Sequence, residues 1–181
     1  MTIQLRQICL VAENLKPVVA DLQAIFGLEV CFVDAGVGIF GLENSLFSVG
    51  TNFLEVVAPI KSETPAGRFL KRRGGDTGYM VICQCDTRAT QLSAKERATA
   101  EDVRVAWEQD IDGFKCMQLH PGDTGGAFFE LDWDPAGDFI GHWEPAGGNA
   151  WKDLPGAPLI TEFQPIAVSY THLTLPTSDL V

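Results

Sequence analysis

The chain has 181 residues, of which 46% are apolar, and this is enough for one hydrophobic core but too little for two large domains. Its formal charge of -11 opposes binding to a phosphate backbone, so we expect no nucleic-acid partner. The longest apolar runs have the length of strands, and no basic-then-apolar leader opens the chain. We therefore expect a cytoplasmic protein without membrane segments.

The cysteines support the same location. They all lie in apolar, strand-like runs, their number is odd and no pair has C-x-x-C spacing. This pattern favours buried free thiols in a reducing compartment over a disulfide framework or a structural zinc site. The residues concerned are Cys9, Cys31, Cys83, Cys85 and Cys116.

The first third of the chain predicts the element order β-α-β-β-β. Residues 5–11 are apolar and β-prone, and Asn14 can cap an amphipathic helix that stops at Gly27. Strand-like segments separated by glycine-containing turns follow over residues 28–34, 38–50 and 51–60.

A second unit of the same order covers residues 77–134. Alignment of the first strands of the two units sets Gln7 against Met80, and alignment of the last strands sets Glu55 against Glu130, with nearly the same offset. This agreement indicates an internal duplication. We therefore predict an α+β fold of two tandem βαβββ modules, at about 4–60 and 77–134 within a domain at 1–134, with a short helix between them.

The rest of the chain does not follow this pattern. Residues 135–167 are rich in Gly, Pro and Trp, and we expect an irregular segment that packs its tryptophans on the domain and ends in the start of a truncated strand. Residues 168–181 resemble a translated sequencing adapter and are interpreted as a non-native tail, so His172 supports no functional argument. The alternatives are a genuine edge strand there, and a second paired domain, beginning near residue 158, that holds the functional site.

Two glutamates are the candidate functional acids. Strand alternation places Glu55 on one face with Phe53 and Val57, and Glu130 on one face with Phe128 and Asp132. If the modules curl into a cup, these faces line an apolar pocket that contains a few polar groups, and a carboxyl group there has a raised pKa that suits proton transfer. The alternative is that both glutamates face solvent.

Conventional metal motifs are weak in this sequence. His120 lies in a turn and His142 in the irregular segment, so an imidazole site would need two distant segments to converge. The acids at positions 132, 134 and 138 lack the glycine and the distal glutamate of a calcium loop.

Two stretches resemble a known family. "NFLEVVAPIKSETPAGRFLKRRGGDTGYMVI" and "LHPGDTGGAFFELD", together with the duplicated element order, resemble the vicinal oxygen chelate superfamily, which includes glyoxalase I, bleomycin-resistance proteins and extradiol dioxygenases. The local likeness is to methylmalonyl-CoA epimerase. The resemblance implies that the modules form a cup-shaped mixed sheet, and pairing of subunits in the family implies a homodimer.

The resemblance also implies metal-ligand positions, one on the first and one on the last strand of each module. They fall on Gln7, Glu55, Met80 and Glu130. The family usually has histidine at the two first-strand positions. Gln7 offers an amide oxygen, but the Met80 thioether is too soft for Mg²⁺ or Mn²⁺, so we expect no metal cofactor; a bound metal would rely on Gln7, Glu55 and Glu130.

Two functions remain open at this stage. The first is binding of a small organic ligand in the cup, over a degenerate metal site, by residues Gln7, Phe53, Met80, Phe128 and His120. The second is an isomerase or lyase that moves a proton next to a carbonyl with Glu55 and Glu130 as bases. Its substrate would be an acyl-CoA, because the basic stretch from Arg68 to Arg73 can meet an anionic carrier.

Overall fold

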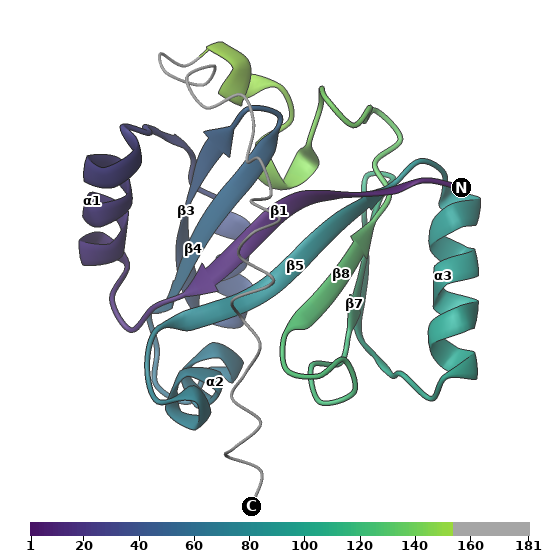
Figure 1. Cartoon of the computed structure of the whole chain (residues 1–181), viewed down its shortest axis with the longest axis horizontal. Coiled ribbons are helices and arrows are strands. Elements are labelled where there is room, and N and C mark those ends of the chain that lie inside the picture. Colours follow the sequence, from purple (N-terminus) through teal and green to yellow (C-terminus); the bar gives the residue numbers. More distant parts are fainter. Residues whose placement is uncertain (154–181) are drawn as a thin grey trace, which may run out of the picture.

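The structure, a computed structural model, describes residues 1–153 (Figure 1). The truncated strand near residue 158 and the adapter-like tail at 168–181, both predicted from the sequence, lie outside the described residues. The first module consists of β1 (Ile3–Val11), α1 (Leu15–Phe26), β2 (Val30–Phe32), β3 (Leu42–Val49) and β4 (Asn52–Pro59). The second consists of β5 (Thr77–Cys85), α3 (Arg88–Ala100), β6 (Val105–Ile111), β7 (Phe114–Leu119) and β8 (Phe128–Asp132), and α2 (Pro65–Arg73) joins the two.

The strands form one mixed eight-stranded sheet in the order β2-β3-β4-β1-β5-β8-β7-β6. The antiparallel pair β1 and β5 runs through its centre, as Figure 1 shows, and each of these strands pairs in parallel with the last strand of its own module. The predicted α+β fold of two tandem βαβββ modules is therefore confirmed.

The register of the sheet reproduces the alignment of the two modules. Gln7 lies opposite Phe53 on β1 and β4, and Met80 lies opposite Phe128 on β5 and β8. In the same register, Cys9 faces Glu55 and Ile82 faces Glu130. The two glutamates therefore occupy equivalent positions in the two modules.

The two long helices cover the outer face of the sheet. Leu15 and other apolar residues of α1 pack over Phe47 and Val56, while Ala94 of α3 packs over Cys83 and Met117. In Figure 1, α1 lies at the left end of the sheet and α3 at the right end. Because successive side chains of a strand point to opposite faces, the residues that alternate with these core positions are left for the concave face.

The type of element differs from the prediction between β2 and β3. Residues 38–50 were expected as a strand, but Ala35–Phe40 form a 3₁₀ helix, η1, and β2 is only three residues long. The Asp34 carboxylate accepts a hydrogen bond from the Gly36 N–H at the start of η1, and Gly41 ends it at φ 72°. Local bonding by the aspartate and the left-handed glycine favour a tight turn over an extended strand.

The segment after β8 packs against both modules. Trp143 and Trp151 are buried; Trp151 lies edge-on to Phe53 of the first module, and Trp143 lies edge-on to Phe114 of the second. This segment includes two short 3₁₀ helices, η2 (Glu144–Ala146) and η3 (Ala150–Asp153). Within residues 1–153, no helix combines the length and the apolar character that crossing a bilayer requires.

Candidate functional site

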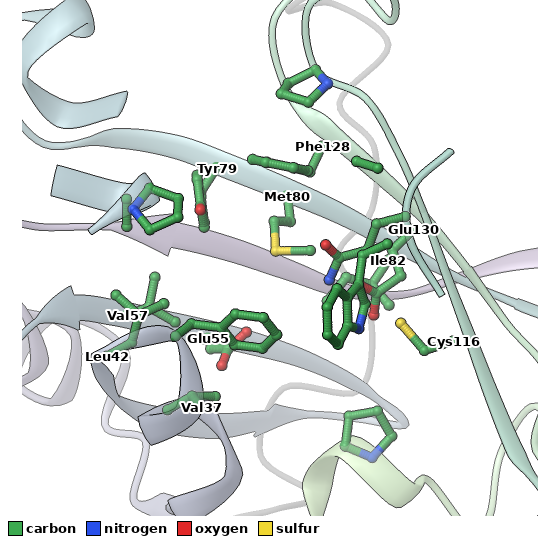
Figure 2. Close-up of a pocket in the computed structure, with 18 of the residues that line it drawn as sticks. Val37, Leu42, Glu55, Val57, Tyr79, Met80, Ile82, Cys116, Phe128 and Glu130 are labelled. Atoms are coloured by element: carbon green, nitrogen blue, oxygen red, sulfur yellow. The ribbon is translucent and has the colours of Figure 1, made fainter. Parts of the chain in front are cut away.

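A cavity of about 1120 Å³ lies on the concave side of the sheet (Figure 2). Both modules, α2 and residues 144–147 contribute to its walls. Its apolar lining includes Val37, Leu42, Val57, Tyr79, Met80 and Phe128. Gln7, Glu55 and Glu130 place polar groups within this apolar wall.

The structure brings most of the predicted site residues together. The cavity is lined by Gln7, Glu55, Met80, His120, Phe128 and Glu130. The glutamates are each only 6% exposed, and Figure 2 shows Glu55 on one side and Glu130 on the other. Phe53 lies apart from these residues: it is not among the described lining residues, and its ring packs edge-on against that of Trp151 at a centroid distance of 5.3 Å.

Glu55 is held by two side-chain amides. Gln7 donates from Nε2 to Glu55 Oε2 at 2.9 Å, and Asn44 donates from Nδ2 to Oε1 at 2.7 Å. Burial raises the pKa of Glu55, while the hydrogen bonds from Asn44, Cys9 and Gln7 work in the opposite direction. The result is a buried carboxyl group with a fixed orientation and a raised pKa.

Gln7 is itself fixed from the opposite side. The indole N–H of Trp143 donates to Gln7 Oε1 at 2.9 Å, so the amide oxygen is turned toward the indole and the amide nitrogen toward Glu55. An amide nitrogen does not coordinate a cation, and the Met80 thioether is a soft donor. The four positions that the resemblance implied therefore do not fit a hard divalent cation.

Glu130 has different neighbours from those of Glu55. A Glu130 carboxylate oxygen, an Asp132 carboxylate oxygen and the Cys116 sulfur lie within 4.8 Å of one another. Burial raises the pKa of Glu130, and burial together with the charge of Glu130 holds the pKa of Asp132 well above its usual value. The Cys116 side chain and the Met117 backbone act to lower the pKa of Asp132. Within residues 1–153, however, no donor forms a hydrogen bond of good geometry with either Asp132 carboxylate oxygen, although the residue is 0% exposed.

The prediction missed Asn44 and Cys116, which contact or approach the two glutamates. Leu46 of β3 lies opposite Glu55, and Gln118 of β7 lies opposite Glu130. Asn44 lies two positions before Leu46, and Cys116 lies two positions before Gln118. Asn44 and Cys116 therefore occupy equivalent positions in the two modules. Extending the internal alignment to the third strand of each module would have found both.

The described histidines are held by separate partners. His120 Nδ1 lies 3.1 Å from the Gly122 backbone nitrogen and 3.3 Å from an Arg104 guanidinium nitrogen. His142 Nδ1 lies 2.7 Å from an Asp134 carboxylate oxygen. Of these two rings, only that of His120 belongs to the cavity lining.

One end of the cavity is basic. Helix α2 begins at the capping residue Thr64 and contributes Arg68, Arg72 and Arg73 to the lining. The Arg73 guanidinium donates to the Gly126 carbonyl oxygen and lies 5.2 Å from the Phe69 ring centre. Three guanidinium groups at this end can attract an anionic part of a ligand.

The chain has the vicinal oxygen chelate fold, as solved structures of that fold show. Methylmalonyl-CoA epimerase from Mycobacterium tuberculosis is 17% identical, with a TM-score of 0.60, over 72% of this chain and 87% of that one. A Streptomyces coelicolor methylmalonyl-CoA epimerase in complex with 2-nitronate-propionyl-CoA is 18% identical, with a TM-score of 0.61, over 73% and 97%.

A hypothetical protein from Bacillus halodurans is similar to the same extent, at 15% identity and a TM-score of 0.62, over 74% of this chain and 96% of that one. No protein-family model matches the chain, and no curated protein matches it. At these identities the comparisons define the fold and leave the chemistry to the residues of the site.

Proposed function

We propose that the chain binds a small organic ligand in the cavity between its two modules. The observation that carries the proposal is the cavity itself, about 1120 Å³ in volume, with largely apolar walls and a few fixed polar groups. Pockets for drug-sized ligands have volumes of about 300–1,000 Å³ and the same kind of lining. The cavity therefore has room for a ligand with an extended apolar or acyl part.

Filling the cavity tests this proposal. Val37 lines the cavity, whereas Val33, four residues earlier, is 60% exposed and is not among the described lining residues. Thermal unfolding with a panel of aromatic acids and acyl-CoA esters should reveal one class that stabilises the wild type. Val37→Trp should abolish that shift, and Val33→Trp should retain it. Equal stabilisation of both variants would contradict binding in the cavity.

A second candidate is proton transfer next to the carbonyl of an acyl-CoA. Glu55 and Glu130 favour it, because they stand at equivalent positions in the two modules and line the same cavity from opposite sides. Such an arrangement allows one carboxylate to remove a proton and the other to return it on the opposite face. The basic end of the cavity and the likeness to methylmalonyl-CoA epimerases support an acyl-CoA as the substrate.

Deuterium wash-in at the α-carbon tests the second candidate. Acyl-CoA esters incubated in D₂O with the protein should gain deuterium, and Glu55→Gln or Glu130→Gln should slow the exchange by at least about a hundredfold if the residue is a base. Glu43→Gln is a matched control, because Glu43 is an exposed glutamate on the same sheet. Exchange that is unchanged in both cavity variants would exclude these residues as bases.

Two further parts of the proposal concern the protein in solution. We propose that two copies of the chain pair, as the resemblance implies, and that the protein is located in the cytoplasm, which suits the five free thiols of the described residues. Light scattering of the full chain measures the first, and a monomer at micromolar concentration would contradict it.

A further inference from the structure

Three potential ligand groups meet on neighbouring strands of the second module. Gln118 lies opposite Glu130, and Lys115 forms a bridge with Trp133, so Cys116 of β7 lies opposite Asp132 of β8. Glu130 and Asp132 are two residues apart on one strand and share its concave face. This register brings the Cys116 sulfur and one oxygen of each carboxylate within 4.8 Å of one another.

Asp132 is an independent sign that a ligand belongs there. The residue is 0% exposed, and no donor among residues 1–153 forms a hydrogen bond of good geometry with either of its carboxylate oxygens. Burying a carboxylate without a partner is unfavourable, because the group loses its hydration and gains no hydrogen bond in return. The buried Arg6 forms no bond with Asp132: its guanidinium donates to Gln84 and to the Asp138 carbonyl oxygen, and its Nε has no partner among residues 1–153.

We propose that Cys116, Glu130 and Asp132 form a binding site for a divalent transition-metal cation of the Zn²⁺ type. One thiolate and two carboxylates are ligands that Zn²⁺ accepts, whereas Mg²⁺ and Ca²⁺ require oxygen ligands alone. The cation would cancel the repulsion between the two carboxylates and supply both with a partner. Among the positions that the family resemblance implied, this site uses only Glu130.

The site would have an open position toward the cavity. Zn²⁺ sites with three protein ligands keep a fourth position for water or a substrate oxygen. Cys116 and Glu130 both line the cavity, and Figure 2 shows the Cys116 sulfur directed toward Glu130 at its edge. The cation would therefore meet an oxygen-containing part of a ligand bound in the cup.

Cation binding by Cys116, Glu130 and Asp132 goes beyond the proposed ligand binding and does not depend on it. Cation binding does compete with the proposed proton transfer, because a carboxylate that coordinates a cation is not free to accept a proton. With a cation at this site, Glu55 would be the single carboxylate base of the pair. Metal binding and deuterium exchange therefore report on different proposals.

Metal binding to the full chain tests the site directly. After treatment with a chelator and dialysis, isothermal titration with ZnCl₂ should show one cation per chain, and Zn²⁺ should raise the unfolding temperature. Cys116→Ser and Asp132→Asn should each weaken binding by at least about tenfold, which corresponds to about 1.4 kcal/mol. Cys31→Ser and Glu43→Gln, which alter a thiol and an exposed glutamate outside the cluster, should retain wild-type affinity.

Cobalt spectroscopy identifies the sulfur ligand. Co²⁺ bound to the wild type should show a sulfur-to-metal charge-transfer band that is absent in Cys116→Ser, and this holds even if another variant fails to fold. The absence of stoichiometric uptake by the wild type would overturn the proposal, as would wild-type affinity in both cluster variants. Infrared detection of a protonated carboxyl group that persists at neutral pH with Zn²⁺ present would also overturn it, because the two acids would then share a proton instead.

Discussion

Trp143 donates its indole N–H to Gln7 Oε1 at 2.9 Å, although the two residues are 136 positions apart. The bond joins the segment after β8 to β1, one of the two strands at the centre of the sheet. Because Gln7 in turn donates to Glu55, the orientation of a cavity carboxylate depends on a tryptophan outside both modules. The additional segment therefore takes part in arranging the site.

Removal of this bond should destabilise the protein. In Trp143→Phe the aromatic packing is largely retained, but Gln7 Oε1 is left buried without its donor, so we expect a loss of about 1–3 kcal/mol in the free energy of unfolding. Urea denaturation measures it. Trp107→Phe is the control, since Trp107 is 39% exposed and should change stability by less than about 0.5 kcal/mol. Equal losses in the two variants would contradict a specific role for the indole N–H.

The raised pKa of Glu55 predicts a pH-dependent contribution to stability. Burial raises this pKa above the unfolded value of about 4.3, so the folded state holds the proton more tightly than the unfolded state. The stabilising effect is complete below the unfolded pKa and is lost as the pH rises through the folded pKa. Glu55→Gln lacks this titration, so its stability relative to the wild type should increase as the pH rises from acid values toward neutrality.

Denaturation of both proteins over that pH range provides the measurement. A stability difference that does not change with pH would show that the pKa of Glu55 is the same in the folded and unfolded states. The exposed Glu43→Gln variant should show no such trend.

The fold and the floor of the cavity were predictable because strand alternation and an internal repeat are local signals. The alignment that matched Gln7 with Met80 and Glu55 with Glu130 is the one that the register of the sheet shows. The 3₁₀ helix η1 was missed because Asp34 and the glycines around it act through a turn, which periodicity does not reveal.

The partners of the site residues were not predictable in the same way. The bond between Trp143 and Gln7 depends on how an irregular segment packs against the sheet, and no periodic pattern in that segment indicates its path. Phe53 shares the strand face of Glu55, but Trp151 from the same segment covers it. Alternation identifies the face of a side chain, whereas tertiary packing decides whether that face remains open.

Arg6 anchors the irregular segment and should control its mobility. The buried guanidinium donates to the carbonyl oxygens of Asp138 and Gly141 and lies 4.9 Å from the Trp143 ring centre, and burial lowers its pKa to about 10. Arg6→Met removes these bonds, so we expect a loss of about 1.5–3 kcal/mol for hydrogen bonds from a charged group.

Hydrogen exchange locates this effect. In Arg6→Met, amides within residues 134–153 should exchange faster, while those of α3 should keep their protection. Arg6→Lys retains a positive charge but lacks the planar guanidinium group with its several N–H donors. The exchange rates of these amides in Arg6→Lys should therefore lie between those of the wild type and of Arg6→Met. Uniformly faster exchange over the whole chain would contradict a specific anchoring role.

Two adjacent glycines allow the basic end of the cavity to be tested without altering an arginine. Gly125 and Gly126 both have positive φ, 86° and 127°, so alanine at either position should cost about 1–3 kcal/mol in backbone strain. Of the two positions, only at Gly126 would the added Cβ clash with a neighbour, the Arg73 guanidinium. If Arg73 helps to hold an anionic carrier, Gly126→Ala should weaken acyl-CoA binding several-fold more than Gly125→Ala, whereas binding of an uncharged acyl ester should be affected equally. Titration of both variants with the two ligands measures this difference, and equal effects on acyl-CoA binding would exclude Arg73 from ligand recognition.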